Sequence, residues 1–133
     1  MKYHHDHIHL TTQSVDAWVH WYTASMGATV TRRSSDSGNV MIDLDVGGVS
    51  VRISNRTGVE MQMSERAGLT VLPPEGFHHL GFLVDDIDAW VADLVAKGAS
   101  LATPVGQASP TVRYAFLKLP TGLLVEAVQQ SEE

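Results

Sequence analysis

The chain has 133 residues, 44% of them hydrophobic and 18% charged, which is typical of one globular domain without a membrane-spanning segment. Its formal net charge of −6 argues against binding to nucleic acid or to an anionic membrane, and the absence of cysteine excludes disulfides, thiolate metal sites and cysteine nucleophiles. Residues 1–7 lack the apolar segment of a secretory signal, so we expect a cytoplasmic enzyme or binding protein for small molecules.

The first expected element is a strand at about residues 5–12, because apolar and polar side chains alternate there. Ser14 is expected to cap the following helix with its side-chain oxygen, and Gly27 to end it in a left-handed conformation. The helix has one apolar face, made of Val15, Trp18, Val19 and Tyr22. Strands near 28–33, 38–46 and 49–54 follow, the last two joined by a Gly47-Gly48 turn.

The same pattern returns in the second half of the chain. His7 and His79 each lead a segment that reaches an Asp-Ala-Trp-Val tetrad at the same spacing. The second copy is expected to have a strand near 77–84, a helix capped by Asp86 and ended by Gly98, and strands near 100–102, 111–118 and 123–129. Its helix has the matching apolar face: Ile87, Trp90, Val91 and Leu94. The repeat predicts an α+β fold of two tandem βαβββ modules.

These modules are expected to form a single domain over residues 1–133. Module one covers 1–55, a linker covers 56–76, and module two covers 77–133. The linker contains Pro73, Pro74 and Gly76 and has no clear periodicity. A long segment of this kind is often a lid or a binding loop, and a plain connector is an equally good interpretation.

Alternation along the first strand of each module places its leading histidine on the sheet face away from the helix. His7, His9 and His79 are therefore expected to share this face. In the last strand, Glu126 is the exception to an apolar run, and a carboxylate there is costly unless it is paired or binds a cation. Alignment of the two hairpin turns places Arg52 of module one at the position of Glu126. Closure of the modules into one sheet is expected to bring these residues into one concave site.

Metal ligation is the interpretation that we favour for His7, His79 and Glu126. A lone histidine in a strand is more often structural or exposed. Two histidines at equivalent positions of a repeat, with one isolated carboxylate, change that balance, because imidazole nitrogen and carboxylate oxygen are common ligands of transition metals. His9 has two open interpretations, a role next to the site or a surface position.

The quoted segments resemble one known family. Residues 7–10, 77–87 and 119–126 are similar to members of the vicinal oxygen chelate superfamily, which includes glyoxalase I, methylmalonyl-CoA epimerase, extradiol dioxygenases and the fosfomycin and bleomycin resistance proteins. The resemblance implies an open, partly closed β-barrel with the helices outside, and a homodimer. It also implies one divalent metal ion (Zn, Ni, Co, Mn or Fe) held by His7, His79 and Glu126.

Arg52 departs from the family pattern. Glyoxalase-like and epimerase-like members carry a further ligand at this position, commonly Glu or Gln, whereas a guanidinium cannot bind a metal. The resemblance therefore implies three protein ligands and up to three open coordination positions. This difference leaves the reaction open.

Our leading hypothesis is a metal-dependent isomerase, epimerase or glyoxalase-type lyase. The metal would chelate two substrate oxygens and stabilise an enediolate, while His9, Asp43 or Glu126 moves the proton and Arg52 binds an anionic group. The first alternative is an iron(II) dioxygenase of the extradiol type, because two histidines and one carboxylate form a facial triad. The second is a non-catalytic protein that binds an antibiotic or another small molecule.

Overall fold

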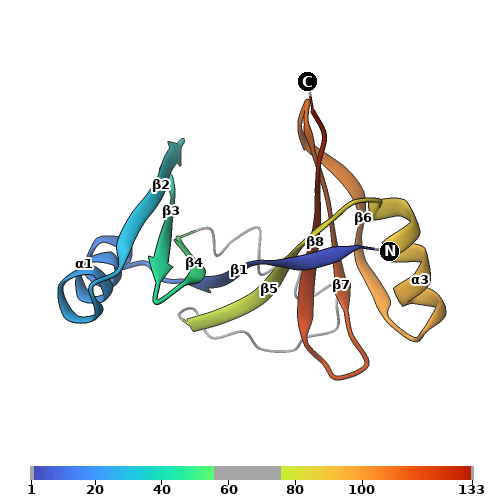
Figure 1. Ribbon diagram of the computed structural model, residues 1–133, viewed down its shortest axis with the longest axis horizontal. Coiled ribbons are helices and arrows are strands. Elements are labelled where there is room, and N and C mark those ends of the chain that lie inside the picture. The colour runs from blue at the N-terminus through green and yellow to red at the C-terminus, as the bar shows by residue number, and fades with distance from the viewer. Residues whose placement is uncertain (1, 56–75, 133) are drawn as a thin grey trace. The chain divides into compact units, whose positions relative to one another are not determined.

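The computed structural model describes residues 2–55 and 76–132 (Figure 1). The predicted linker lies outside these residues, apart from Gly76. Among the described residues, no helix combines the length and apolar character needed to cross a membrane.

The order of the elements follows the sequence repeat. Module one consists of β1 (Tyr3–Thr11), α1 (Val15–Met26), β2 (Thr29–Asp36), β3 (Asn39–Val46) and β4 (Val49–Ser54). Module two consists of β5 (Gly76–Val84), α3 (Ile87–Ala96), β6 (Ser100–Ser109), β7 (Val112–Lys118) and β8 (Leu124–Gln130). The predicted α+β class with two βαβββ modules is confirmed.

The described residues form two compact units. Residues 7–55 and 76–78 make up the module-one unit, and residues 2–6 and 79–132 make up the module-two unit. Strands β1 and β5 therefore each contribute to both units. The hydrogen-bonded neighbours follow the order β2-β3-β4-β1-β5-β8-β7-β6 in a mixed sheet of eight strands.

Both modules use the same pairing of first and last strands. In module one β1 is parallel to β4, with His9 opposite Arg52. In module two β5 is parallel to β8, with Gly81 opposite Glu126. The remaining strands of each module pair antiparallel. Because His9 and Gly81 are equivalent in the repeat, Arg52 and Glu126 occupy equivalent positions, as the alignment of the turns predicts.

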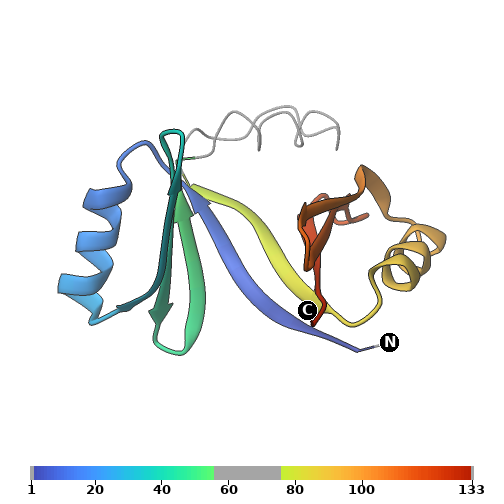
Figure 2. The same cartoon turned by 90° about the horizontal axis from the view of Figure 1, so that it is seen from above.

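Each helix packs on the sheet of its own module, as Figure 2 shows for α1 and α3. The apolar stripe of α1 packs against β3 and β4 in one core: Val15, Val19, Ile42, Leu44, Val51 and Ile53. The stripe of α3 packs against β7 and β8 in a second core, which includes Ile87, Trp90, Val91, Leu117, Val125 and Ala127. These cores determine which strand residues remain on the opposite face.

The helix termini differ from the sequence prediction in two details. Asp86 caps α3 as expected, since its Oδ1 accepts a hydrogen bond from the Ala89 amide at 3.1 Å. The predicted side-chain cap at Ser14 is wrong: within the described chain its hydroxyl makes no cap bond, and its own amide donates to Thr12 Oγ1. Gly27 ends α1 in the left-handed conformation at φ 68°, whereas α3 is capped by Lys97, and Gly98 follows at φ 111°.

Strand β6 is longer than predicted, because pairing with β7 continues to Ser109 instead of ending near residue 102. Its register shifts between Leu101 and Thr103, between Thr103 and Gly106, and between Gln107 and Ser109. Such bulges allow Pro104, which has no amide hydrogen, within the strand. The extension places Gly106 opposite Tyr114.

Candidate functional site

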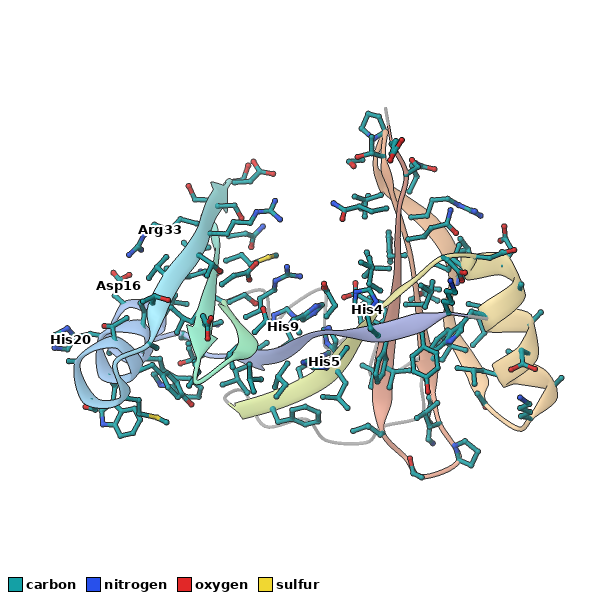
Figure 3. The ribbon with its side chains drawn as sticks, in the orientation of Figure 1. His4, His5, His9, Asp16, His20 and Arg33 are labelled. Carbon is teal, nitrogen blue, oxygen red and sulfur yellow. The ribbon has the colours of Figure 1, made fainter. Side chains whose placement is uncertain are left out.

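The module-one unit contains a group of buried histidines next to β4. His7 is 1% exposed and His9 is 3% exposed, and their ring centroids lie 6.0 Å apart. Figure 3 labels His9 among the side chains of β1. His9 Nε2 shares a 2.7 Å hydrogen bond with Ser54 Oγ, which fixes the orientation of the ring. The expectation that His7 and His9 avoid the helix face is confirmed, because they alternate along β1 with Ile8 and Leu10, which stand opposite the core residues Val51 and Ile53.

His78 is a member of this group that the sequence analysis missed. It is buried, and its ring centroid lies 6.1 Å from that of His9. Simple alternation assigns residue 78 to the face opposite residue 79, so it predicts only His79 on the face of His7 and His9. The sequence feature that pointed to His78 was the His-His pair near the start of β5. Near the end of a strand, neighbouring side chains can lie in different surroundings.

Arg52 is held by a carboxylate of its own module. Its Nε donates to Asp43 Oδ1 at 2.8 Å and its Nη2 donates to Asp43 Oδ2 at 3.2 Å. The two residues face each other in the β3–β4 register, and both side chains are largely buried. Asp43 therefore lies on the same face as Arg52, and this pair is a fork-shaped contact that fixes the plane of the guanidinium.

The module-two unit brings together two of the predicted ligands. His79, which is 1% exposed, has its Nε2 3.5 Å from Glu126 Oε1. The His79 ring also packs edge-on against Phe116, with the centroids 5.0 Å apart. Glu126 stands opposite Phe116 in the β7–β8 register, while its neighbours Val125 and Ala127 point into the α3 core. The carboxylate is thus placed on the face away from α3, as predicted.

This pair has the chemistry of a metal site. An imidazole nitrogen and a carboxylate oxygen lie close together, and burial removes much of the water that would compete for them. Zinc, nickel, cobalt, manganese and iron all accept this combination of ligands. The donor set therefore fits a divalent metal, while the full ligand set of His7, His79 and Glu126 remains a prediction.

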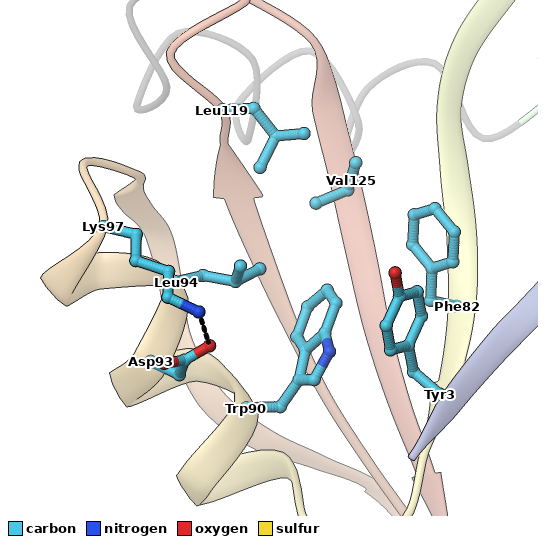
Figure 4. A pocket seen from close by; sticks show the side chains of 8 residues that line it. All are labelled: Tyr3, Phe82, Trp90, Asp93, Leu94, Lys97, Leu119 and Val125. Atoms are coloured by element: carbon cyan, nitrogen blue, oxygen red, sulfur yellow. Dashed lines mark hydrogen bonds and ion pairs between the residues drawn. The ribbon is translucent and has the colours of Figure 1, made fainter. Parts of the chain in front are cut away.

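A cavity of about 440 Å³ lies in the module-two unit on the other face of its sheet (Figure 4). Its walls are mostly aromatic and aliphatic, and an ion pair between Lys97 and Asp93 lies beside them at 2.9 Å. The lining residues Phe82 and Val125 belong to the core against α3. The cavity is therefore separated by the sheet from His79 and Glu126, and we do not assign the chemistry to it.

Comparison with known proteins places these residues in a family context. The model of the Glyoxalase/Bleomycin resistance protein/Dioxygenase superfamily matches residues 4–127. No curated protein sequence matches the chain.

Solved structures show the same fold. A hypothetical protein from Bacillus halodurans C-125 has a TM-score of 0.75 and 17% identity, covering 100% of this chain and 98% of that chain. Methylmalonyl-CoA epimerase from Streptomyces coelicolor, in complex with 2-nitronate-propionyl-CoA, has a TM-score of 0.70 and 25% identity, covering 96% and 94%. The epimerase from Mycobacterium tuberculosis has a TM-score of 0.70 and 20% identity, covering 96% and 88%.

Proposed function

The chain belongs to the Glyoxalase/Bleomycin resistance protein/Dioxygenase superfamily, and on that premise we propose that it is a divalent-metal-dependent enzyme. Its substrate is a small molecule with two adjacent oxygens, and its reaction is an isomerisation, an epimerisation or a glyoxalase-type lyase step. The observation that carries this proposal is the buried contact between His79 and Glu126. The likeness to methylmalonyl-CoA epimerase supports proton transfer next to a carbonyl.

We assign the metal to His7, His79 and Glu126. His7 repeats the position of His79 in module one, and both imidazoles are buried. A divalent cation at these residues would act as a Lewis acid on the substrate oxygens and so lower the pKa of the adjacent C–H group. Arg52, at the position equivalent to Glu126, is excluded as a ligand because a guanidinium carries no lone pair to donate.

Arg52 is assigned instead to an anionic part of the substrate. Asp43 fixes the guanidinium plane through two hydrogen bonds, and an ordered guanidinium binds a carboxylate or a developing oxyanion with defined geometry. This assignment predicts a substrate with a carboxylate or a comparable negative group, in addition to the chelating oxygens.

His9 is assigned as the residue that moves the proton. Its ring is buried and oriented by Ser54, and a neutral imidazole is the commonest general base in enzymes. Asp43 is the weaker candidate, because its carboxylate is engaged by Arg52. Glu126 is the remaining candidate, if its carboxylate leaves the metal during the reaction.

One specific feature favours a second function, an iron(II) dioxygenase. Arg52 takes the place of a fourth ligand, and two histidines with one carboxylate are the ligand set of non-haem iron oxygenases. The two functions differ in their requirements. The first works without oxygen and with several metals, whereas the second needs iron and consumes oxygen.

The decisive experiment loads the metal-free protein with zinc, nickel, cobalt, manganese or iron(II). Methylmalonyl-CoA in D2O under nitrogen serves as the epimerase probe, and NMR follows deuterium incorporation at the carbon next to the carbonyl. Catechol with an oxygen electrode serves as the dioxygenase probe. Glu126→Ala tests the ligand, and Glu132→Ala, at an exposed position, is the matched control.

Metal-dependent exchange that is lost in Glu126→Ala and retained in Glu132→Ala supports the proposal. Oxygen uptake with iron alone replaces it with the dioxygenase. Binding of a small molecule without metal and without turnover identifies a binding protein and contradicts both.

A further inference from the structure

The cavity between α3 and the sheet of module two is bounded on one side by three aromatic rings. The ring centroid of Tyr3 lies 5.8 Å from those of Phe82 and Trp90, and the centroids of Phe82 and Trp90 lie 6.1 Å apart (Figure 4). The rest of the apolar wall is aliphatic: Leu94, Leu119 and Val125. Its volume of about 440 Å³ is in the range of small-molecule sites, roughly 300–1,000 Å³. A space of this size and lining suits a flat, mainly apolar molecule.

Trp90 brings a buried polar group to this cavity. The side chain is 6% exposed, and its indole N–H can only donate a hydrogen bond. Among residues 2–55 and 76–132 no side chain or backbone group accepts from it, and the aromatic face of Tyr3 is at most a weak acceptor. Buried donors are nearly always paired with protein, with water or with a ligand. The Trp90 indole therefore offers a donor to a molecule in the cavity.

Tyr3 marks the side from which a ligand can enter. It belongs to the N-terminal part of β1, which lies in the module-two unit, and it is 58% exposed. Figure 4 shows the nitrogen of the Trp90 indole on the ring edge that faces Tyr3. A molecule that enters beside Tyr3 therefore meets the indole N–H. Because Trp90 itself is almost completely buried, a small molecule inside the cavity can reach its nitrogen more easily than a protein surface that covers the opening.

The charges beside the cavity favour a neutral ligand. Lys97 Nζ lies 2.9 Å from Asp93 Oδ2, and these are the two charged residues of the lining. They neutralise each other, so the cavity has no net charge with which to attract an ion. A ligand charge would lose its hydration against the apolar wall without a counter-charge in return. The cavity thus differs in preference from the opposite sheet face, where Glu126 and His79 suit a metal.

We propose that this cavity is a second binding site for a neutral aromatic molecule with one acceptor oxygen, which accepts a hydrogen bond from the Trp90 indole. The inference is independent of the metal and of the reaction proposed above. The repeat supplies a control within the chain. Trp18 has the position of Trp90 in module one, where Leu10 replaces Phe82 and packs with Trp18 against the module-one core.

The test compares two probes of the same shape, acetophenone and α-methylstyrene. They differ in one group, because a CH2 in α-methylstyrene replaces the carbonyl oxygen of acetophenone. Each is titrated into the full-length, nitrogen-15-labelled protein, and NMR follows the indole N–H signals of its three tryptophans. Trp90→Phe removes the donor and keeps an aromatic ring, and Trp18→Phe is the matched control. Both variants also assign the signals, and thermal unfolding verifies that they are folded.

We expect saturable binding of acetophenone that moves the Trp90 indole proton downfield and leaves the Trp18 signal in place. Acetophenone should bind about threefold to tenfold more tightly than α-methylstyrene, which is the difference typical of one hydrogen bond between neutral groups. In Trp90→Phe the two probes should bind equally, because the donor is gone. Trp18→Phe should keep the preference of the parent for acetophenone.

Three results would overturn the inference, and the first two need no variant. Acetophenone that leaves the Trp90 signal unchanged in the parent shows that the cavity does not take such a ligand. Equal affinity of the parent for the two probes removes the hydrogen bond. A preference for acetophenone that persists in folded Trp90→Phe assigns it to another donor. Each of these results leaves the proposed function intact, because the metal ligands lie on the other face of the sheet.

Discussion

The two modules have the same backbone fold and differ in the chemistry of the sheet face away from the helix. Both have the βαβββ order, and both pair the first strand with the last in the same register. On the face away from the helix, module one carries the ion pair of Arg52 and Asp43, where module two carries Glu126 and Phe116. The cores preserve the register, whereas the opposite face is free to diverge.

The comparison shows how one change of charge alters the chemistry of this face. A glutamate within β8 lies beside His79, where it suits a metal. An arginine at the same place in β4 requires a counter-ion, which Asp43 supplies from the neighbouring strand. One change of charge therefore replaces a carboxylate beside a histidine with a guanidinium paired to a carboxylate, without a change of fold.

The largest effect on stability is expected where the modules are most alike. Leu44 and Leu117 occupy equivalent positions, and both are completely buried. Leu44→Ala and Leu117→Ala should each lower the free energy of unfolding by about 2–5 kcal/mol, because each leaves a cavity in its own core. Urea unfolding monitored by circular dichroism measures this loss. If either variant loses less than about 1 kcal/mol, the two cores are not equivalent.

The next largest effect on stability is expected at Arg52, a position where the two modules differ. Arg52→Ala leaves the largely buried carboxylate of Asp43 without its partner, which should cost about 1–3 kcal/mol of stability. The variant should retain its metal and bind anionic ligands more weakly. Denaturant unfolding, elemental analysis and oxalate titration provide the three readouts. The double variant Asp43→Ala/Arg52→Ala is the control, since it removes both charges, and it should recover part of the stability.

A smaller effect distinguishes the two helix starts. Asp86→Ala should destabilise the protein by about 1 kcal/mol, because the Asp86 carboxylate accepts a hydrogen bond from the Ala89 amide. Ser14→Ala at the equivalent place in module one should have almost no effect, because the Ser14 side chain makes no cap bond within the described residues. Equal losses in the two variants, measured by thermal unfolding, would contradict this difference.

The smallest effect is a pH dependence from an ion pair of module two that the equivalent positions of module one, Asp16 and Val40, do not form. Arg113 donates to both carboxylate oxygens of Asp88 at 3.0 Å, and these hydrogen bonds lower the pKa of Asp88. A lowered pKa in the folded state stabilises the protein above the pKa of the unfolded chain, about 3.9, and this contribution disappears as the pH falls through the folded value.

Asp88→Asn should therefore lower the melting temperature slightly at neutral pH and have less effect in acid. Asp16→Asn is the matched control, because Asp16 occupies the position of Asp88 in the repeat, while the equivalent of Arg113 is Val40. An equal shift for both variants, or a shift for Asp88→Asn that grows as the pH falls, would contradict the role of this ion pair.

The repeat made most of the fold predictable from sequence. Alternating strands and helical apolar stripes depend on neighbours close in the chain, so the βαβββ order and the faces of His7, His9 and His79 could be predicted. The continuation of β6 through Pro104 could not, because it depends on bulges opposite β7. The failure of Ser14 as a side-chain cap has a different, local origin, because the Ser14 amide donates a hydrogen bond to Thr12 Oγ1.

The candidate site was predictable in its residues and less so in its contacts. Glu126 stood out as a single carboxylate in an apolar strand, and Arg52 followed from the alignment. The pairing of Arg52 with Asp43 required the register of β3 against β4, which alternation alone leaves open by one residue. His78 was missed because its significance depends on a contact with His9 of another strand.

The metal content of the purified, untagged protein tests the central claim most directly. Elemental analysis should find about one divalent ion per chain in the parent and in Arg52→Ala. His7→Ala, His79→Ala and Glu126→Ala should lose the ion and remain folded, with metal affinity reduced by more than about 100-fold, since changes to residues that merely support a ligand already cost 10- to 100-fold. Retention of the ion in His79→Ala or Glu126→Ala, or its loss in Arg52→Ala, would contradict the account.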